Sequence, residues 1–450
     1  MSSIVKTVQY PQGNVLLRNL SKNYPLVDRG EGPYLFDSNG KKYFDASGGA
    51  LVTSLGHGLD EIVDEVAAQM KRVAYVNGHH FTSAAMEEFS TKLVEASPLK
   101  GNGRVALLGS GSEAIEAAFK FVRQLWVERG QSERSVFIAR TPGYHGNTLF
   151  ALSASARDHY KKFFGPLLSK VEMVEAPYEY RFTHGDYQKD GPAFFAKQLE
   201  EKINSIGANR VAGFIAETVS GSSTGASVPP SDYFKEIQKV CARHQIPIIA
   251  DEVMCGAGRT GKYFAADHFD FKPDVIVLGK GINAGLMPLS ALLVRQDFVD
   301  EMKKASGGFM HAQTYMHTPT LAATGLAVFN FMQKHKVVEN AQVQGKKFIE
   351  ALKIRLGSHP WVGAVSGLGL MVGIEFVKDK KSKLPFDRNE KRIEKFAQLC
   401  FDRGLLVWTN TGHADGINGD LIMLGPPLNI TEAQQFECVE LICNCIKDFN

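Results

Sequence analysis

The hydrophobic pattern between residues 104 and 294 alternates between short apolar runs and amphipathic stretches. Apolar positions recur at helical spacing in 112–129 and 231–244, whereas the runs between such stretches have strand length and many β-branched residues. Continuous apolar runs are typical of strands that are buried on both faces of a parallel sheet. Strands are therefore expected at 104–108, 135–139, 171–174, 211–216, 246–250, 274–278 and 289–294. Their alternation with helices predicts an α/β domain with a seven-stranded, mostly parallel sheet.

The pattern differs at both ends of the chain. Near the N-terminus, 34–36 and 43–45 flank a Ser-Asn-Gly turn, which predicts a β-hairpin. Amphipathic helices are expected at 61–73 and 86–96, and an irregular insertion at 177–205. The C-terminal third predicts a helical stretch at 319–357, strands at 370–377 and 421–424, and a last helix that opens with the capping box Thr431-x-x-Gln434.

We expect three segments from these patterns. Residues 61–320 would form a large domain, and residues 321–450 a smaller α+β domain. The N-terminal segment 1–60 would join the small domain.

Composition excludes several classes of protein. The 450 residues include 44% hydrophobic and 22% charged residues, and a net charge of +3 argues against bulk electrostatic binding of nucleic acid. We find no apolar run of about 18 residues and no signal-like N-terminus, so we expect a cytoplasmic protein that does not cross a membrane. The six cysteines show no C-x-x-C and no Cys/His metal spacing, so neither a disulfide framework nor a metal site is expected.

Two predicted strands end in residues of opposite charge. The run 246–250 stops at Asp251, and the run ending at 278 is followed by Gly279-Lys280-Gly281. Ligands of parallel sheets bind beyond the carboxyl ends of the strands, so a carboxylate and an amine would face one crevice. A lysine can form a Schiff base with pyridoxal 5′-phosphate (PLP), and an aspartate can keep the PLP ring nitrogen protonated. The alternative is a solvated Lys280 and a helix-capping Asp251, but the two glycines favour the close approach of a bound ring.

The sequence contains two glycine-rich loops that could bind a phosphate or form turns. Residues 109–113 follow a predicted strand and open a helix, an arrangement that binds a phosphate with backbone amides. Residues 109–114 also match a loose dinucleotide fingerprint, and 256–262 nearly match a P-loop, with Tyr263 in place of the required Ser or Thr. We favour a cofactor phosphate at the first loop and a tight turn at the second. Tyr144, in another loop, could stack on a flat cofactor.

In combination these motifs resemble one family over nearly the whole chain. The segments SGSEAIEAAFK, YHGNT, IIADEVMCGAGRTG, VLGKGINAGLMPLSALL and LIMLGPPLNIT occur in the order seen in class III aminotransferases. The resemblance implies the fold type I (aspartate aminotransferase) architecture and PLP as cofactor. It implies a transaminase that moves an amino group from a donor to a 2-oxo acid through an internal aldimine and pyridoxamine phosphate. A PLP-dependent aminomutase, racemase or decarboxylase remains an alternative, with a nicotinamide-dependent oxidoreductase less favoured.

The resemblance also assigns roles to individual residues. Lys280 would form the internal aldimine and shuttle the proton, and Asp251 would hold the ring nitrogen. Thr314 would reach the phosphate of a neighbouring subunit, which implies a homodimer, with a tetramer as a larger alternative. The other implied cofactor contacts are Gly111 and Ser112 to the phosphate, Tyr144 and Val253 to the ring faces, and Glu217 near the cofactor oxygen.

Three departures from the family pattern concern the substrate. Met254 stands where Gln is frequent, Thr218 where Pro is frequent, and Trp408 where many members carry a carboxylate-binding arginine. Leu51 stands near the loop that shapes the same pocket in related enzymes. We therefore expect the part of the pocket that receives the substrate to be apolar. The expected donors are amines or amino monocarboxylates, and pyruvate is expected as acceptor before 2-oxoglutarate. Arg140 or Arg157 would be the alternative contacts for a substrate carboxylate.

Overall fold

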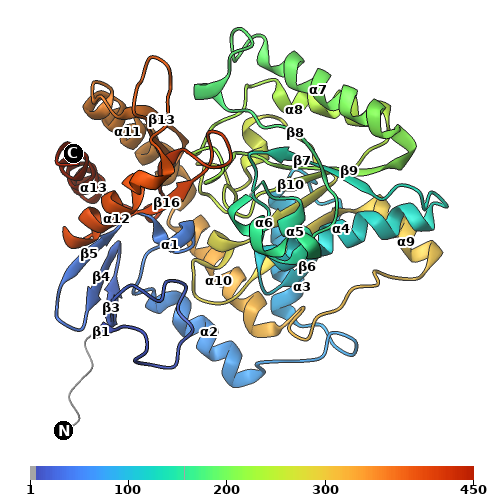
Figure 1. Cartoon of the computed structure of the whole chain (residues 1–450). Helices are drawn as coiled ribbons and strands as arrows, with labels where there is room; N and C mark the ends of the chain where they lie inside the picture. The colour runs from blue at the N-terminus through green and yellow to red at the C-terminus, as the bar shows by residue number, and fades with distance from the viewer. Residues whose placement is uncertain (1–6, 157, 450) are drawn as a thin grey trace.

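A seven-stranded sheet forms the centre of the larger lobe (Figure 1). The computed structural model describes residues 7–156 and 158–449. The spatial order is β6 (Gly103–Leu108), β12 (Ser290–Arg295), β11 (Val275–Leu278), β10 (Ile248–Asp251), β9 (Val211–Glu217), β7 (Val136–Thr141) and β8 (Glu172–Glu175). Strand β12 runs antiparallel to both neighbours, and the other pairs are parallel. The predicted α/β class and mostly parallel sheet are confirmed.

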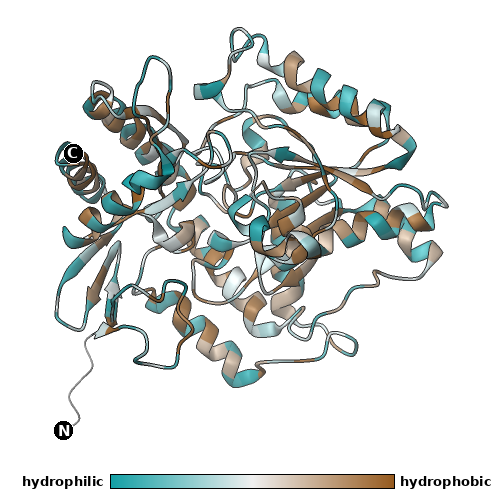
Figure 2. Ribbon diagram, in the orientation of Figure 1, coloured by the Kyte–Doolittle hydropathy of each residue, from teal (hydrophilic) through white to brown (hydrophobic). Residues whose placement is uncertain are grey.

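Helices cover both faces of this sheet. On one face, α4 (Gly111–Glu128) and α9 (Gln296–Ala305) pack on alternate residues of the central strands. The other face is covered by α7 (Gly191–Ile206) and α8 (Tyr233–Arg243) at one end and by α3 (Ala84–Ala96) and α10 (Pro319–Lys334) at the other. The central strands are therefore mostly hydrophobic along their whole length (Figure 2), which explains their continuous apolar runs.

The smaller lobe contains another sheet, which is antiparallel. Its order is β13 (Val362–Leu368), β14 (Met371–Phe376), β17 (Asp420–Leu424) and β16 (Trp408–Thr411). Its helices are α11 (Val337–Leu356), α12 (Arg392–Asp402) and α13 (Glu432–Lys447). The capping box of Thr431 and Gln434 at the start of α13 is confirmed.

The N-terminal hairpin shares a sheet with the C-terminal third. The hairpin consists of β4 (Tyr34–Asp37) and β5 (Lys42–Asp45), as predicted, and β3 (Val27–Glu31) extends it. On its other edge β5 pairs in parallel with β15 (Leu405–Leu406). In Figure 1 the blue hairpin accordingly lies beside the red C-terminal elements. The boundaries at residues 60 and 320 stay a prediction.

Two predicted elements differ from the structure. The helical stretch 319–357 is broken into α10 and α11 at Lys336, whose φ of 50° is left-handed. The prediction of an irregular insertion over 177–205 is wrong in its second half, because Gly191–Ile206 forms α7 with a proline in its first turn. The remaining elements are β1 (Thr7–Val8), β2 (Tyr24–Pro25), α1 (Gly48–Leu51), α2 (Asp60–Arg72), α5 (Leu149–Ser153) and α6 (Asp158–Phe164).

The described residues include no helix that is both long and apolar enough to cross a membrane. The six cysteines are all buried thiols.

A buried charge cluster joins the two lobes. Glu375 of β14 accepts hydrogen bonds from the Tyr178 hydroxyl and from Arg181, whose Nε lies 3.0 Å from the carboxylate. His413 lies 3.2 Å from the same carboxylate. Burial by itself raises the pKa of Glu375, but His413, Arg181 and Tyr178 together lower it below its ordinary value. The ionised carboxylate thus holds the irregular segment before α7 against the small lobe.

Substitution Glu375→Gln removes this charge and leaves Arg181 without its carboxylate. Breaking a buried pair in this way costs about 3 kcal/mol, so we expect a lower Tm at pH 7. Because the folded-state pKa is depressed, the carboxylate's contribution is present above the ordinary value of 4.5 and is lost as the pH falls below it. The difference in Tm from wild type should therefore narrow towards pH 4 in circular dichroism melts. A difference that is the same at both pH values would contradict this role.

Candidate active site

A cavity of about 160 Å³ lies beyond the carboxyl ends of β7, β9, β10 and β11. Seven of the predicted site residues line it: Gly111, Ser112, Tyr144, Glu217, Asp251, Val253 and Lys280. The other lining residues are Ser110, His145, Gly146, Val219, Gly221, Ser222, Met254 and Cys255. Among the described side chains no group of His, Cys, Asp and Glu could hold a metal ion.

Asp251 is fixed by hydrogen bonds to both carboxylate oxygens. It is the last residue of β10 and is buried, with 5% of its surface exposed. Its Oδ2 lies 2.7 Å from Nδ1 of His145, and its Oδ1 accepts the backbone N–H of Val253 at 3.0 Å. His145 is in turn held by its own backbone N–H, which donates to Ser155 at 2.9 Å. The sequence analysis assigns no role to His145, although its place in the YHGNT segment is an available signal.

Lys280 follows the end of β11, the strand next to β10, and also lines the cavity. Its φ of 46° places a non-glycine residue in the left-handed region, a strained conformation that occurs often at functional sites. A Cβ atom on Gly279 would lie 3.1 Å from Val253, so glycine lets the end of β11 pass close to that side chain. The hydroxyl of Ser54 donates to the carbonyl of Gly281 at 3.1 Å and holds the turn from the other side.

The N-terminus of α4 closes a further side of the cavity. Ser110 caps the helix by accepting the N–H of Glu113, and Ser112 Oγ accepts the N–H of Asn147 at 3.0 Å. A Cβ atom on Gly111 would lie 2.8 Å from Val253, so only glycine fits there. The first N–H groups of a helix have no partner within the helix and attract anions, which makes this end suitable for a phosphate.

Glu217 lies directly beside Asp251. The two residues are in register on the neighbouring strands β9 and β10. Both carboxylate oxygens of Glu217 accept the hydroxyl of Ser223, at 2.8 and 3.2 Å.

Arg140 was one alternative for binding a substrate carboxylate. It is buried, its guanidinium donates to the backbone carbonyl of Glu217, and it does not line the cavity. The other alternative, Arg157, lies outside the described residues.

Leu51 and Trp408, the residues predicted for the substrate pocket, do not line the cavity themselves. They belong to an apolar cluster with Val219, Met254 and Cys255, which line the cavity directly. Leu51 is fully buried, and a Cβ atom on Gly425 would lie 2.4 Å from its Cγ. The wall formed by Val219, Met254 and Cys255 is therefore apolar, and neither Leu51 nor Trp408 belongs to the cavity lining.

The loop after Asp251 anchors the cavity to both lobes. Glu252 accepts the N–H groups of Ala265 and Ala266, both at 2.7 Å, and the hydroxyl of Thr218. At the far end of the loop Arg259 donates to the backbone carbonyls of Leu370 at 3.1 Å and Pro426 at 2.6 Å in the small lobe. Burial raises the pKa of Glu252 to about 7 and lowers that of Arg259 to about 9. The glycine-rich segment turns tightly, with φ of 87° at Gly258 and 86° at Gly261, as the tight-turn interpretation expected, and it also connects the two lobes.

Thr314 does not line this cavity. It is exposed, in the segment between α9 and α10.

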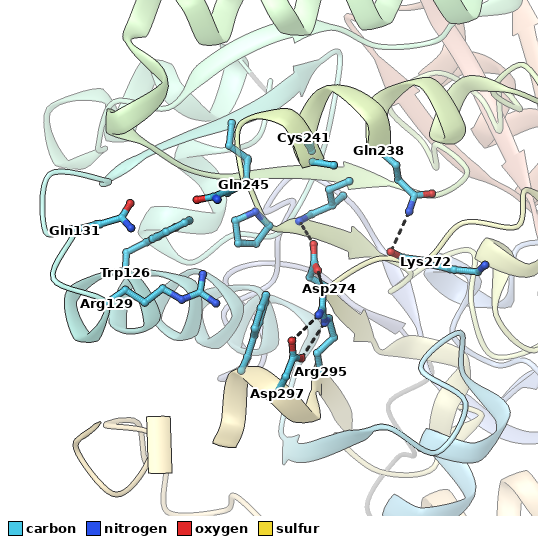
Figure 3. Close-up of a pocket in the computed structure, with 15 residues that line it drawn as sticks. Trp126, Arg129, Gln131, Gln238, Cys241, Gln245, Lys272, Asp274, Arg295 and Asp297 are labelled. Carbon is cyan, nitrogen blue, oxygen red and sulfur yellow. Dashed lines mark hydrogen bonds and ion pairs between the residues drawn. The ribbon is translucent and has the colours of Figure 1, made fainter. Parts of the chain in front are cut away.

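A larger cavity, of about 700 Å³, lies at the amino ends of β10 and β11 (Figure 3). Its lining includes Trp126, the start of β10 and the end of β12. On its wall Arg295 bonds to Asp274 at 2.7 Å and also to Asp297. None of the predicted site residues lies there.

The chain matches known proteins over nearly its full length. Residues 18–446 match the family model of class III aminotransferases. The chain is 34% identical to the uncharacterized aminotransferase YodT of Bacillus subtilis, covering 95% of this chain and 96% of that protein. It is 31% identical to the putrescine–pyruvate aminotransferase of Pseudomonas aeruginosa, covering 94% and 91%. An (S)-enantioselective omega-transaminase from Thermomicrobium roseum superposes with a TM-score of 0.87 at 33% identity, covering 94% and 92%.

The fold and the site define a fold type I enzyme that uses PLP. The residues present fit this cofactor, because the cavity combines a lysine amine, a buried carboxylate held by a histidine, and a helix N-terminus. The chain belongs to the class III aminotransferases and catalyses transamination.

The contact between His145 and Asp251 leads to a testable prediction. Substitution His145→Ala removes the bond to Asp251 and leaves a buried carboxylate oxygen unsatisfied, which costs about 1–3 kcal/mol. We expect PLP affinity and turnover to fall on the order of 10–100-fold, measured by cofactor titration and by kcat. Substitution His145→Asn places a donor near the position of Nδ1 and should restore most of the loss. Equal behaviour of the two variants would contradict an orienting role.

Proposed function

We propose that this enzyme transfers the amino group of an amine or amino monocarboxylate to pyruvate. The observation that carries the proposal is the convergence of Lys280, Asp251 and the α4 N-terminus on one cavity with an apolar substrate side. The acceptor of the P. aeruginosa relative, as its name states, is pyruvate.

Each residue has a definite task in this proposal. Bound PLP supplies an electron sink for the bond to the substrate Cα. Lys280 Nζ holds the aldehyde carbon of the cofactor, and once released it moves the proton away from the substrate Cα. Asp251 accepts a hydrogen bond from the protonated ring nitrogen, with His145 fixing its orientation. Gly111 and Ser112 hold the phosphate, while Tyr144 and Val253 enclose the ring and Glu217 lies near the cofactor oxygen.

The expectation of pyruvate as acceptor is supported by the described arginines, none of which lines the cavity. Trp408 occupies the position at which many family members carry one, and Arg140 is engaged by the backbone carbonyl of Glu217. A second carboxylate would enter a cavity walled by Val219, Met254 and Cys255, where no described arginine offers a bidentate partner. Pyruvate has no second carboxylate, so it avoids this cost.

The test is the half-reaction of the holoenzyme with single donors. We expect L-alanine to remove the visible absorbance of bound PLP and to release stoichiometric pyruvate, with a higher second-order rate constant than L-glutamate. The Lys280→Ala protein is the matched control and should bind PLP without turnover. A higher rate constant for glutamate would overturn the pyruvate proposal, and a pyridoxyl label on another lysine after borohydride reduction would overturn the role of Lys280.

Substitution Asp251→Asn keeps the shape of the side chain but removes its charge. Without the charge the ring nitrogen loses its proton, and the electron sink weakens. We expect kcat to fall by about three to four powers of ten, the scale seen when a charge-orienting carboxylate is neutralised, with Tm nearly unchanged. Activity within about threefold of wild type would exclude this role.

We also propose a cytoplasmic homodimer in which Thr314 reaches the phosphate site of the partner subunit. In support, Thr314 is exposed within its own chain, and large apolar side chains are exposed on its segment and on the segment before α3. Met310, Tyr315 and Phe81 are 68%, 66% and 66% exposed, and the Tyr75 and Tyr315 rings contact each other at 6.0 Å. An exposed apolar surface of this kind is typical of an interface.

Substitution Thr314→Ala should weaken PLP retention about tenfold by removing one charge-assisted hydrogen bond. Light scattering should give twice the chain mass for both proteins, so the loss would not reflect dissociation. An active monomer, or a dimeric Thr314→Ala protein that retains PLP as wild type does, would refute the shared site.

A further inference from the structure

The C-terminal ends of α12 and α13 lie side by side in the smaller lobe (Figure 1). The residues that cap the two helices, Arg403 and Asp448, form an ion pair at 2.8 Å. Arg403 also donates to the backbone carbonyl of Asn444 at 3.1 Å. One turn before each cap is a cysteine, Cys400 in α12 and Cys445 in α13. Equivalent positions in two adjoining last turns therefore carry thiols.

The two thiols contact each other. Both side chains are buried in the core of the smaller lobe, with 0% of Cys400 and 1% of Cys445 exposed. The thiol of Cys400 donates a hydrogen bond to the sulfur of Cys445, and the guanidinium of Arg403 interacts with that same sulfur. The side chain of Arg403 is itself 37% exposed. Arg403 thus lies between the sulfur of Cys445 and the solvent.

The environment of Cys445 favours its thiolate, the form of cysteine that reacts with oxidants. The hydrogen bond from Cys400 and the charge of Arg403 lower the pKa of the Cys445 thiol, although burial raises it. The Arg403 charge also offsets the helix dipole, which is unfavourable for an anion at a helix C-terminus. In the four cysteines outside the pair, burial raises the pKa of the thiol: Cys241, Cys255, Cys438 and Cys443. Cys445 is therefore the thiol that reacts first.

We propose that Cys400 and Cys445 form a redox-modification site, which a peroxide converts into a disulfide between α12 and α13. The Cys445 thiolate attacks one oxygen of hydrogen peroxide and the O–O bond breaks. The sulfur is oxidised to a sulfenic acid, and the leaving hydroxide takes up the proton that Cys445 had released. The Cys400 sulfur then attacks the Cys445 sulfur, the S–O bond breaks, and the Cys400 proton leaves with the oxygen as water. Two thiols and one peroxide thus give one disulfide and two waters, and a dithiol reductant reverses the modification.

The position of the pair allows the bond to close. A disulfide requires the sulfurs to approach to about 2.05 Å. The movement falls on the last turns of two helices, and helix ends open more readily than helix interiors. Neither thiol lines the active-site cavity, so this site goes beyond the proposed function and does not depend on it. Cys255, which does line that cavity, provides an internal comparison.

The first experiment maps disulfides in the folded, full-length holoenzyme after brief treatment with hydrogen peroxide and alkylation of the remaining thiols. Trypsin separates the two cysteines, because it releases 396–403 and 404–447 as different peptides. We expect these peptides to appear as one linked species, about 2 Da lighter than the two reduced peptides together. Dithiothreitol should separate them. Oxidation that gives no linked species, or a sulfinic acid on Cys445 in its place, overturns the proposal.

The second experiment identifies the partner of Cys400. The peptide 404–447 also carries Cys438 and Cys443, so the variants Cys445→Ala and Cys443→Ala are compared. Alanine keeps a small apolar side chain in the core, and circular dichroism melts check that both variants are folded. Cys445→Ala should abolish the linked species, whereas Cys443→Ala, the matched control on the same helix, should keep it. A link that persists in Cys445→Ala overturns the assignment.

The variant Cys400→Ala tests the pair from the other helix. Without its partner, Cys445 should stop at the sulfenic acid, which dimedone labels. A Cys445 that forms a disulfide with another cysteine in this variant would contradict the pairing.

Oxidation rates give a readout that needs no cysteine variant. Timed alkylation should show that the Cys400 and Cys445 thiols disappear together, at least about tenfold faster than those of Cys241 and Cys255. Arg403→Gln removes the charge beside Cys445 and should slow formation of the disulfide by about threefold or more. Equal rates for all buried thiols would show general oxidation and overturn the proposal. A rate that Arg403→Gln leaves unchanged would overturn the role of Arg403.

Discussion

The parallel pairing of β10 with β9 and β11 is the constraint on which the site depends. Parallel strands end at the same edge of a sheet, so this pairing places Glu217, Asp251 and the turn to Lys280 around one cavity. The register puts Asp251 directly beside Glu217. A shift by one residue would turn each side chain to the other face and separate the carboxylates from the cavity.

The cavity is lined by groups of different charge. They include the amine of Lys280, the carboxylate of Asp251 and the N-terminus of α4. Glu217 is buried beside Asp251, and both of its carboxylate oxygens accept the hydroxyl of Ser223. Two neighbouring carboxylates with different partners therefore line the cavity.

Buried polar contacts connect this cavity to the smaller lobe at three places. Arg259 donates to backbone carbonyls near β14 and after β17, and Asn410 donates to the carbonyl of Ser222. Glu375 accepts hydrogen bonds from Tyr178 and Arg181 and lies close to His413. Because each contact leaves a buried polar group unsatisfied when it is broken, the lobes are held in one relative position. The apolar cluster that includes Val219, Met254 and Cys255 depends on that position, because it also contains residues of the small lobe such as Leu421 and Met423.

The sequence by itself determined the seven strands, the N-terminal hairpin and the capped last helix, because these depend on local periodicity, turn residues and caps. It also placed Lys280 and Asp251 at strand ends, since each follows an apolar run directly. Only the tertiary structure decided that His145, 106 residues from Asp251, holds its carboxylate, and that Arg140 is occupied by a backbone carbonyl. It likewise decided that Leu51 and Trp408 stay outside the cavity lining and that the carboxylate of Glu217 accepts the hydroxyl of Ser223. These features arise from contacts between residues that are far apart in the chain, and no local pattern of hydrophobic and polar positions records which partner a buried side chain meets.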